Sequence, residues 1–65
     1  MKIFYNGDLL EVQSTTLDSL LVELGLEGQA VATAVNGDFV PLSLRTQQSL
    51  NEEDRIEVVA PMQGG

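Results

Sequence analysis

The tripeptide Asn-Gly-Asp occurs twice in this chain, at residues 6–8 and 36–38, and each copy stands between short runs of β-forming residues. An Asn-Gly pair in that setting is typical of a two-residue type I′ turn, because both central residues of this turn need positive φ angles. The sequence therefore predicts two β-hairpins. The strands expected in them are residues 2–5, 9–12, 31–35 and 39–40, with Pro41 ending or bordering the last one.

One segment has the apolar spacing of an amphipathic helix. Its leucines recur at i, i+3, i+4 and i+7, which places them on one face of a helix, and they are Leu17, Leu20, Leu21 and Leu24. Thr15 is the expected N-cap, and Asp18 lies in the first turn, where the helix dipole favours a negative charge. Gly25 is expected to end the helix in the left-handed conformation, with Leu26 folding back on the last turn.

The rest of the chain consists of a polar stretch at 43–49 that holds at most a turn of helix, an acidic turn at 51–54 and a last strand at 55–59. One amphipathic helix has a single apolar stripe to bury, and a sheet of short strands has one face to cover it. We therefore predict an α+β fold in which one helix packs across a mixed four- to five-stranded sheet. It forms a single domain over residues 1–65 with a flexible tail at about 60–65. The side chains expected on the inner sheet face are Ile3, Tyr5, Leu10, Val12, Ile56 and Val58.

The side-chain inventory argues against catalysis. The chain has no Cys and no His, which removes thiolate nucleophiles, zinc sites of the finger type and imidazole acid–base chemistry. Its carboxylates suggest no acid–base pair, and Glu52–Asp54 lacks the alternating ligands of a calcium loop, so a solvated acidic turn is expected there. We therefore expect no enzyme activity, no metal site and no permanently bound cofactor.

Charge and the N-terminal residues limit the partners and the location. The formal net charge is −7, from three basic and ten acidic side chains. Such a surface repels phosphate backbones and anionic membranes, so neither nucleic acid nor a membrane is an expected partner. The first residues lack the profile of a signal peptide, and a cytoplasmic protein is expected.

The C-terminal end is the candidate functional group. Gly64-Gly65 follows the last predicted strand by a few residues, which would place the Gly65 carboxylate on a short projecting arm. Glycine lets the backbone approach a partner closely, so Met62, Gln63 and Gly64 are expected to thread into a partner active site and present Gly65 for activation. The alternative is a frayed, inert end.

A partner that receives the arm would also need a docking surface. Alternation along the strands places Arg55 and Val59 on the outer sheet face, together with Phe4 and Leu9. These four residues are the predicted docking patch, because small apolar patches rimmed by charge often bind partners. The alternative is scattered surface hydrophobes without a role.

Three stretches resemble the ThiS family of small sulfur carrier proteins. They are Met1–Phe4 with Asn6-Gly7, the run Ala-Val-Asn-Gly-Asp-Phe-Val-Pro at 34–41, and Asp54–Val59 running into Gly64-Gly65. The resemblance covers the whole chain. It implies the β-grasp fold shared with ubiquitin, in agreement with the helix-on-sheet arrangement predicted from the residues.

The resemblance also implies a chemical cycle at Gly65. An adenylating, E1-like enzyme would use ATP and magnesium to activate the carboxylate. A sulfur donor system with a cysteine desulfurase would convert it to a thiocarboxylate, and thiazole synthase would take the sulfur. Many relatives carry a basic residue after the Val-Pro pair where this chain has Leu42, so a partner contact made by arginine there would be missing.

Other functions remain open at this point. One is a sulfur carrier for molybdopterin, cysteine or tRNA thiolation. Others are a ubiquitin-like protein modifier joined through Gly65 and a plain interaction module with an inert tail.

Overall fold

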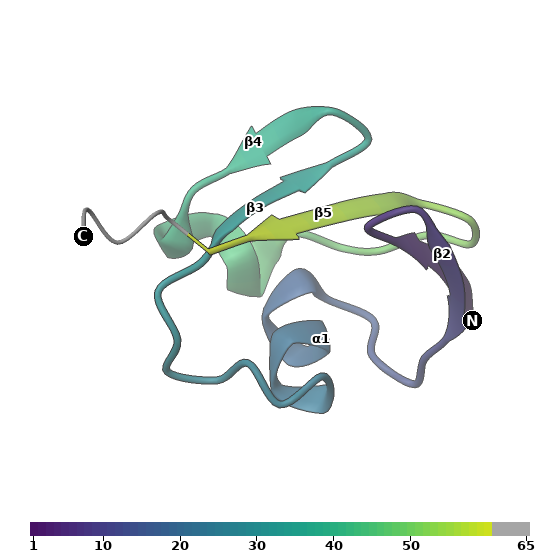
Figure 1. The fold of residues 1–65 in the computed structure, drawn as a ribbon, viewed down its shortest axis with the longest axis horizontal. Helices are drawn as coiled ribbons and strands as arrows, with labels where there is room; N and C mark the ends of the chain where they lie inside the picture. The colour runs from purple at the N-terminus through teal and green to yellow at the C-terminus, as the bar shows by residue number, and fades with distance from the viewer. Residues whose placement is uncertain (61–65) are drawn as a thin grey trace.

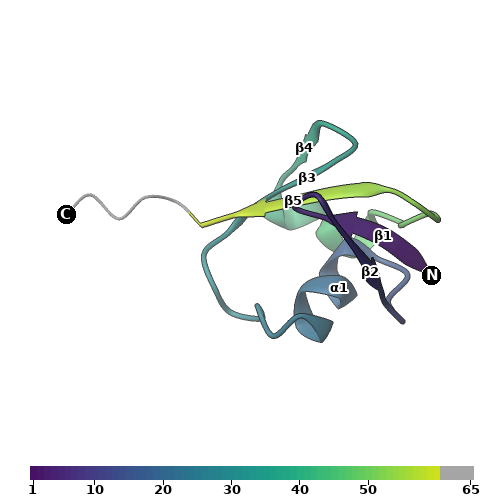
Figure 2. The same ribbon diagram turned by 45° about the vertical axis from the view of Figure 1, so that its right-hand side comes forward.

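The computed structural model describes residues 1–60, and within them five strands form one sheet. The strands are β1 (Lys2–Tyr5), β2 (Asp8–Glu11), β3 (Ala32–Val35), β4 (Asp38–Val40) and β5 (Arg55–Val59), in the spatial order β2-β1-β5-β3-β4. β5 runs parallel to β1 and antiparallel to β3, while the two hairpins are antiparallel. The helix α1 (Leu17–Glu23) lies across one face of this sheet, and the 3-10 helix η1 (Leu42–Gln47) packs beside it (Figures 1 and 2). A mixed sheet with one α-helix across it confirms the predicted α+β fold.

Both Asn-Gly turns form as predicted. The φ angles are 48° at Asn6 and 90° at Gly7, and 51° at Asn36 and 87° at Gly37. Positive φ at both central residues is the type I′ geometry, whose twist matches that of the flanking strands. The strand limits differ from the expected ones by one residue, because β2 and β4 each begin at the Asp of the tripeptide.

The start of α1 corrects the predicted cap. Thr16, not Thr15, is the N-cap: the Thr16 Oγ1 accepts a hydrogen bond from the Ser19 N–H at 3.2 Å. The Ser19 Oγ accepts one from the Thr16 N–H, also at 3.2 Å, which completes a capping box. The Thr15 carbonyl instead accepts a hydrogen bond from the Leu50 N–H at 2.9 Å. Either threonine has a side chain that can cap the helix, and the hydrogen bond between Thr15 and the distant Leu50 leaves Thr16 as the N-cap.

The end of α1 agrees with the prediction. Gly25 has a φ of 77°, in the left-handed region. The Leu26 N–H donates to the Leu21 carbonyl at 2.8 Å, and the Gly25 N–H donates to the Val22 carbonyl at 3.0 Å. This pair of bonds is the Schellman motif, which satisfies carbonyls that the helix itself leaves free.

The core lies between α1 and the inner sheet face. It contains three of the four predicted helix leucines and four of the six predicted sheet residues, while Leu24, Tyr5 and Leu10 pack at its margin. The buried hydrophobic residues are Ile3, Val12, Leu17, Leu20, Leu21, Val35, Val40, Leu50, Ile56 and Val58. No helix in this described part is long and apolar enough to cross a membrane.

Two polar segments differ from their predictions, because residues 43–49 hold more than one turn of helix and the acidic turn is not solvated throughout. The stretch at 43–49 forms most of η1 and buries Arg45, which is only 6% exposed. In the acidic turn Glu52 and Glu53 are exposed, but the prediction is wrong for Asp54, which is buried. The Asp54 Oδ2 accepts a hydrogen bond from the Asn51 N–H at 2.8 Å, and its Oδ1 accepts one from the Asn36 amide at 3.0 Å. The buried Asp54 carboxylate therefore stabilises the turn, and hydrogen bonds from these two donors replace those it would make to water.

Candidate functional site

The sheet face turned away from α1 carries the predicted docking patch. The strand register aligns Leu9, Phe4 and Arg55 in one row across β2, β1 and β5. Val59 lies on the same face of β5, four residues beyond Arg55, or about 13 Å at the rise of a β-strand. Leu9 and Val59 are 57% and 61% exposed. All four residues therefore share one face, with Val59 at the end from which the chain continues to Ala60.

Phe39 adds a residue to this face that sequence reasoning missed. It pairs with Ala34, which pairs in turn with Glu57, so Phe39 lies on the same face as Val59. Its side chain is 69% exposed. The alternation of side chains along a strand could have identified Phe39, because a strand that points Val40 into the core must point the preceding residue outward. The outer face is thus apolar on β4 as well as on β1, β2 and β5.

Two of the three basic side chains lie on this outer face. Lys2 precedes Phe4 by two residues on β1, and Arg55 is paired with Phe4 on β5, so all three point to the same side. Lys2 and Arg55 are exposed, and the only ion pair within residues 1–60 joins the Met1 amino group to Glu11 at 2.7 Å. In a chain of formal charge −7, the two exposed basic side chains therefore lie on one face, where the register also places the exposed Glu11 and Glu57.

The strand β5 leads to the predicted functional group. It is the central strand of the sheet and ends away from the chain's N-terminus (Figure 1). Ala60 follows it and is exposed. Met62, Gln63, Gly64 and Gly65, predicted to enter a partner active site, lie outside the described residues.

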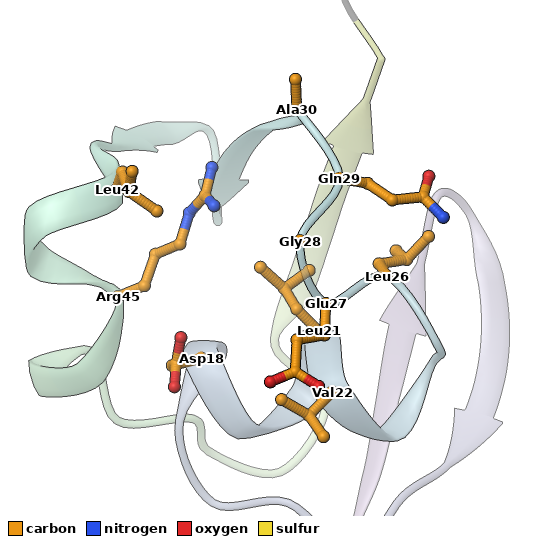
Figure 3. Close-up of a pocket in the computed structure, with 10 residues that line it drawn as sticks. All are labelled: Asp18, Leu21, Val22, Leu26, Glu27, Gly28, Gln29, Ala30, Leu42 and Arg45. Atoms are coloured by element: carbon orange, nitrogen blue, oxygen red, sulfur yellow. The ribbon is translucent and has the colours of Figure 1, made fainter.

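A hollow of about 380 Å³ lies between α1, the segment 26–30 and η1 (Figure 3). Its lining includes Leu21, Leu26, Leu42 and the buried Arg45. The guanidinium of Arg45 donates from Nε to the Thr33 Oγ1 at 3.1 Å and from Nη2 to the Val31 carbonyl at 2.6 Å. These hydrogen bonds connect η1 to the start of β3, so the Arg45 guanidinium in the hollow has a structural role.

Potential metal ligands are dispersed over the described part of the chain. Within residues 1–60 no three Asp, Glu, His or Cys side chains come together in a group that could hold a metal ion. Glu52 accepts a hydrogen bond from the Lys2 N–H at 2.8 Å. The Asp54 carboxylate accepts hydrogen bonds from Asn51 and Asn36. The acidic turn therefore has structural contacts.

A five-stranded mixed sheet with one α-helix across one face and an open apolar opposite face defines a β-grasp domain. Its fold matches the crystal structure of the thiamine biosynthesis protein ThiS from Geobacter metallireducens, with a TM-score of 0.86, 100% of both chains covered and 22% identity. The ThiS family model matches residues 3–65. This chain belongs to the ThiS family.

Two relatives illustrate the similarity. The sulfur carrier protein ThiS of Thermus thermophilus is 36% identical over 97% of this chain and 98% of its own length. A protein of Paramagnetospirillum magneticum named thiazole synthase is 38% identical over 100% of this chain, which spans only 20% of that longer protein.

Proposed function

We propose that this chain is a sulfur carrier of thiamine biosynthesis and that its functional group is the carboxylate of Gly65. The observation that carries this proposal is the family match over residues 3–65, which extends through the diglycine end. The full-length similarity to the Thermus carrier supports it. The chain would act as a co-substrate, with the chemistry performed by partner enzymes.

The proposed cycle follows from the chemistry of a carboxylate, which is a poor electrophile until one oxygen becomes part of a good leaving group. In the active site of an adenylating, E1-like enzyme, a Gly65 oxygen attacks the α-phosphorus of ATP, with magnesium bound to the nucleotide, and pyrophosphate leaves. A persulfide from a cysteine desulfurase system then attacks the acyl carbon and displaces AMP. A thiol cleaves the resulting acyl disulfide, which leaves a thiocarboxylate on Gly65 and a disulfide on the donor side.

The sulfur acceptor in this proposal is thiazole synthase. Once sulfur replaces oxygen, the terminus is a nucleophile at neutral pH, and its sulfur forms a bond to an electrophilic carbon of the acceptor substrate. An oxygen nucleophile then attacks the acyl carbon of Gly65, the acyl C–S bond breaks, the sulfur stays on the acceptor, and Gly65 is again a carboxylate. The longer Paramagnetospirillum protein named thiazole synthase contains a segment similar to this entire chain, as expected if carrier and synthase work together.

The outer sheet face is the proposed docking surface for the adenylating enzyme. Phe4, Leu9 and Val59 supply apolar area, and Arg55 supplies a positive charge beside Phe4. Phe39 extends this surface. Apolar centres with a charged rim are the usual composition of protein–protein interfaces.

The intact mass of the untagged protein recovered from its own cells tests the proposal. A thiocarboxylate replaces one oxygen by sulfur and adds about 16 Da at the terminus, a covalent change that mass spectrometry can localise. Methionine oxidation adds a similar mass, so the signal must map to Gly65 and must disappear into an alkylated product after treatment with a mild electrophile. A variant lacking Gly64-Gly65 is the control.

Two results would contradict the carrier role. One is an unshifted mass that stays unshifted after addition of ATP and cell extract. The other is a series of higher masses from conjugates linked through Gly65 to lysines, which would identify a protein modifier.

A further inference from the structure

The Asn6 side chain binds the end of β5 in addition to forming its turn. Its Nδ2 donates to the Val58 carbonyl at 3.0 Å, and its Oδ1 accepts from the Val58 N–H at 2.9 Å. The Asn6 N–H also donates to the Ile56 carbonyl at 2.9 Å. In a parallel ladder continued past Tyr5 and Ile56, the next partner of the Val58 N–H would be the main-chain carbonyl of residue 6. Because Asn6 turns the chain away at a φ of 48°, its amide takes that place.

The Asn36 side chain makes the corresponding contact at the other end of β5. Its Oδ1 accepts a hydrogen bond from the Arg55 N–H at 2.9 Å, and its Nδ2 donates to Asp54. Both asparagines occupy the first position of a type I′ turn, with φ angles of 48° and 51°. The central strand is therefore held at its first residue by one turn and at its fourth by the other.

We propose that Asn6 is a positioning residue for the C-terminal arm, an inference that rests on the proposed carrier function. Val58 is two residues before Ala60, and the Asn6 amide binds both of its main-chain polar groups on the β1 side. Without that amide, the β1-side pairing of β5 ends at Ile56. Val58 and Val59 are then held from the β3 side alone, through their pairs with Thr33 and Ala32. With one of its two lateral supports removed, the end of β5 moves more and presents Gly65 to the partner active site less reproducibly.

The substitution Asn6→Gly separates the two roles of Asn6, which are to form the turn and to clamp β5 through the two hydrogen bonds of its side-chain amide with Val58. Glycine adopts positive φ without strain, and Gly-Gly is a good type I′ pair, so the hairpin is retained while both amide contacts with Val58 are lost. Asn6 is exposed, so the core is not opened. The matched control is Asn36→Gly, which removes an amide from the same turn position but releases β5 at Arg55.

Amide hydrogen exchange measured by NMR gives a readout that does not depend on function. In Asn6→Gly the Val58 amide should exchange at least about tenfold faster relative to the amides of Leu20 in α1 and of its C-cap Leu24, which report opening of the helix. In Asn36→Gly the Arg55 amide should gain exchange rate while Val58 keeps its protection. Unchanged relative protection of Val58 in Asn6→Gly would overturn the proposal.

The kinetic readout is ATP-dependent adenylation of each variant by the adenylating enzyme. Asn6→Gly should lower kcat on the order of tenfold, because the reacting carboxylate is less well placed. Its KM should change less than about twofold, because the docking side chains are intact. Asn36→Gly should keep the kcat of the original chain, because the contacts of Asn6 with Val58 are intact.

The outcomes separate the two ideas. Equal losses of kcat in Asn6→Gly and Asn36→Gly would show a general effect of a weakened β5 and would overturn the positioning role. If the original chain is not adenylated at all, the carrier function fails and the positioning role fails with it. Faster Val58 exchange in Asn6→Gly would in that case still establish the clamp as a property of the fold.

Discussion

At the scale of single residues, several polar side chains that a sequence pattern assigns to the surface hold the fold together. Arg45 and Asp54 are buried and hydrogen-bonded, and the turn residues Asn6 and Asn36 pair with a strand far away in the sequence. The sequence correctly predicted that both asparagines occupy the first position of a type I′ turn. Their partners were not predictable, because each partner is a backbone group brought there by a long-range strand pairing.

Arg45→Met should destabilise the domain by about 2 kcal/mol, because the Val31 carbonyl and the Thr33 hydroxyl lose a charged donor in a site that water reaches poorly. Methionine keeps most of the packing of the side-chain stem. Urea unfolding followed by circular dichroism measures the difference. Arg55→Met is the control, since Arg55 is exposed and should change stability by less than about 0.5 kcal/mol. Equal effects of the two substitutions would mean that the buried guanidinium contributes no net stability.

At the scale of elements, local signals were sufficient for the hairpin turns and for the C-terminal end of α1. Asn-Gly pairs, leucine spacing and Gly25 act within a few residues, so a sequence reveals them. The 3-10 helix η1 and the order of the strands have no comparable local signal. The choice of Thr16 over Thr15 as N-cap also depends on contact with a distant segment, through the bond between the Thr15 carbonyl and Leu50.

Glu23 joins two elements, and its contribution should depend on pH. From the last turn of α1 its carboxylate accepts hydrogen bonds from the Ser14 hydroxyl and from the N–H groups of Gln13 and Ser14, after β2. These bonds, that from the Ser14 hydroxyl foremost, lower the pKa of Glu23 below its usual value. A lowered pKa in the folded state means that the contribution is complete above the unfolded pKa, about 4.3, and is lost as the pH falls through the folded pKa.

Glu23→Gln should therefore flatten the acid side of the stability profile. Urea midpoints measured from pH 7 to pH 3 should fall less steeply below about pH 4.5 in the variant than in the original chain. Part of the slope should remain, because the hydrogen bond from the Met1 amino group also lowers the pKa of Glu11. Identical slopes in the two proteins would contradict a linked role for Glu23.

At the scale of the whole molecule, the sequence predicted the fold class and the common outer sheet face of Phe4, Leu9, Arg55 and Val59, while the docking role of that face stays a proposal. Alternation along β1 and β5 was enough for Phe4 and Arg55, whereas Phe39 was overlooked on a strand of three residues. The role of Gly65 came from resemblance and from the chemistry of a terminal carboxylate, and it stays a proposal.

The charge asymmetry of the molecule leads to a prediction about docking. Arg55 and Lys2 are the exposed basic side chains and share the proposed docking face with Glu11 and Glu57, whereas the rest of the surface carries the other acidic side chains, so an acidic partner surface would be repelled less at this face than elsewhere. Arg55→Gln should reduce the association rate with the adenylating enzyme several-fold at low salt, on the order of 3-fold or more. The reduction should shrink as ionic strength rises, because screening acts over about 10 Å at 0.1 M salt.

Gln29→Glu provides a control with the same change in formal charge, since either substitution takes the chain from −7 to −8. Gln29 is exposed in the segment 26–30, which borders the hollow next to α1 (Figure 3) and belongs to none of the strands that carry the docking residues. Stopped-flow association at several salt concentrations should therefore leave Gln29→Glu near the original rate while Arg55→Gln is slower. If both variants slow association equally, total charge and not the outer face governs the encounter, and the docking surface must be sought elsewhere.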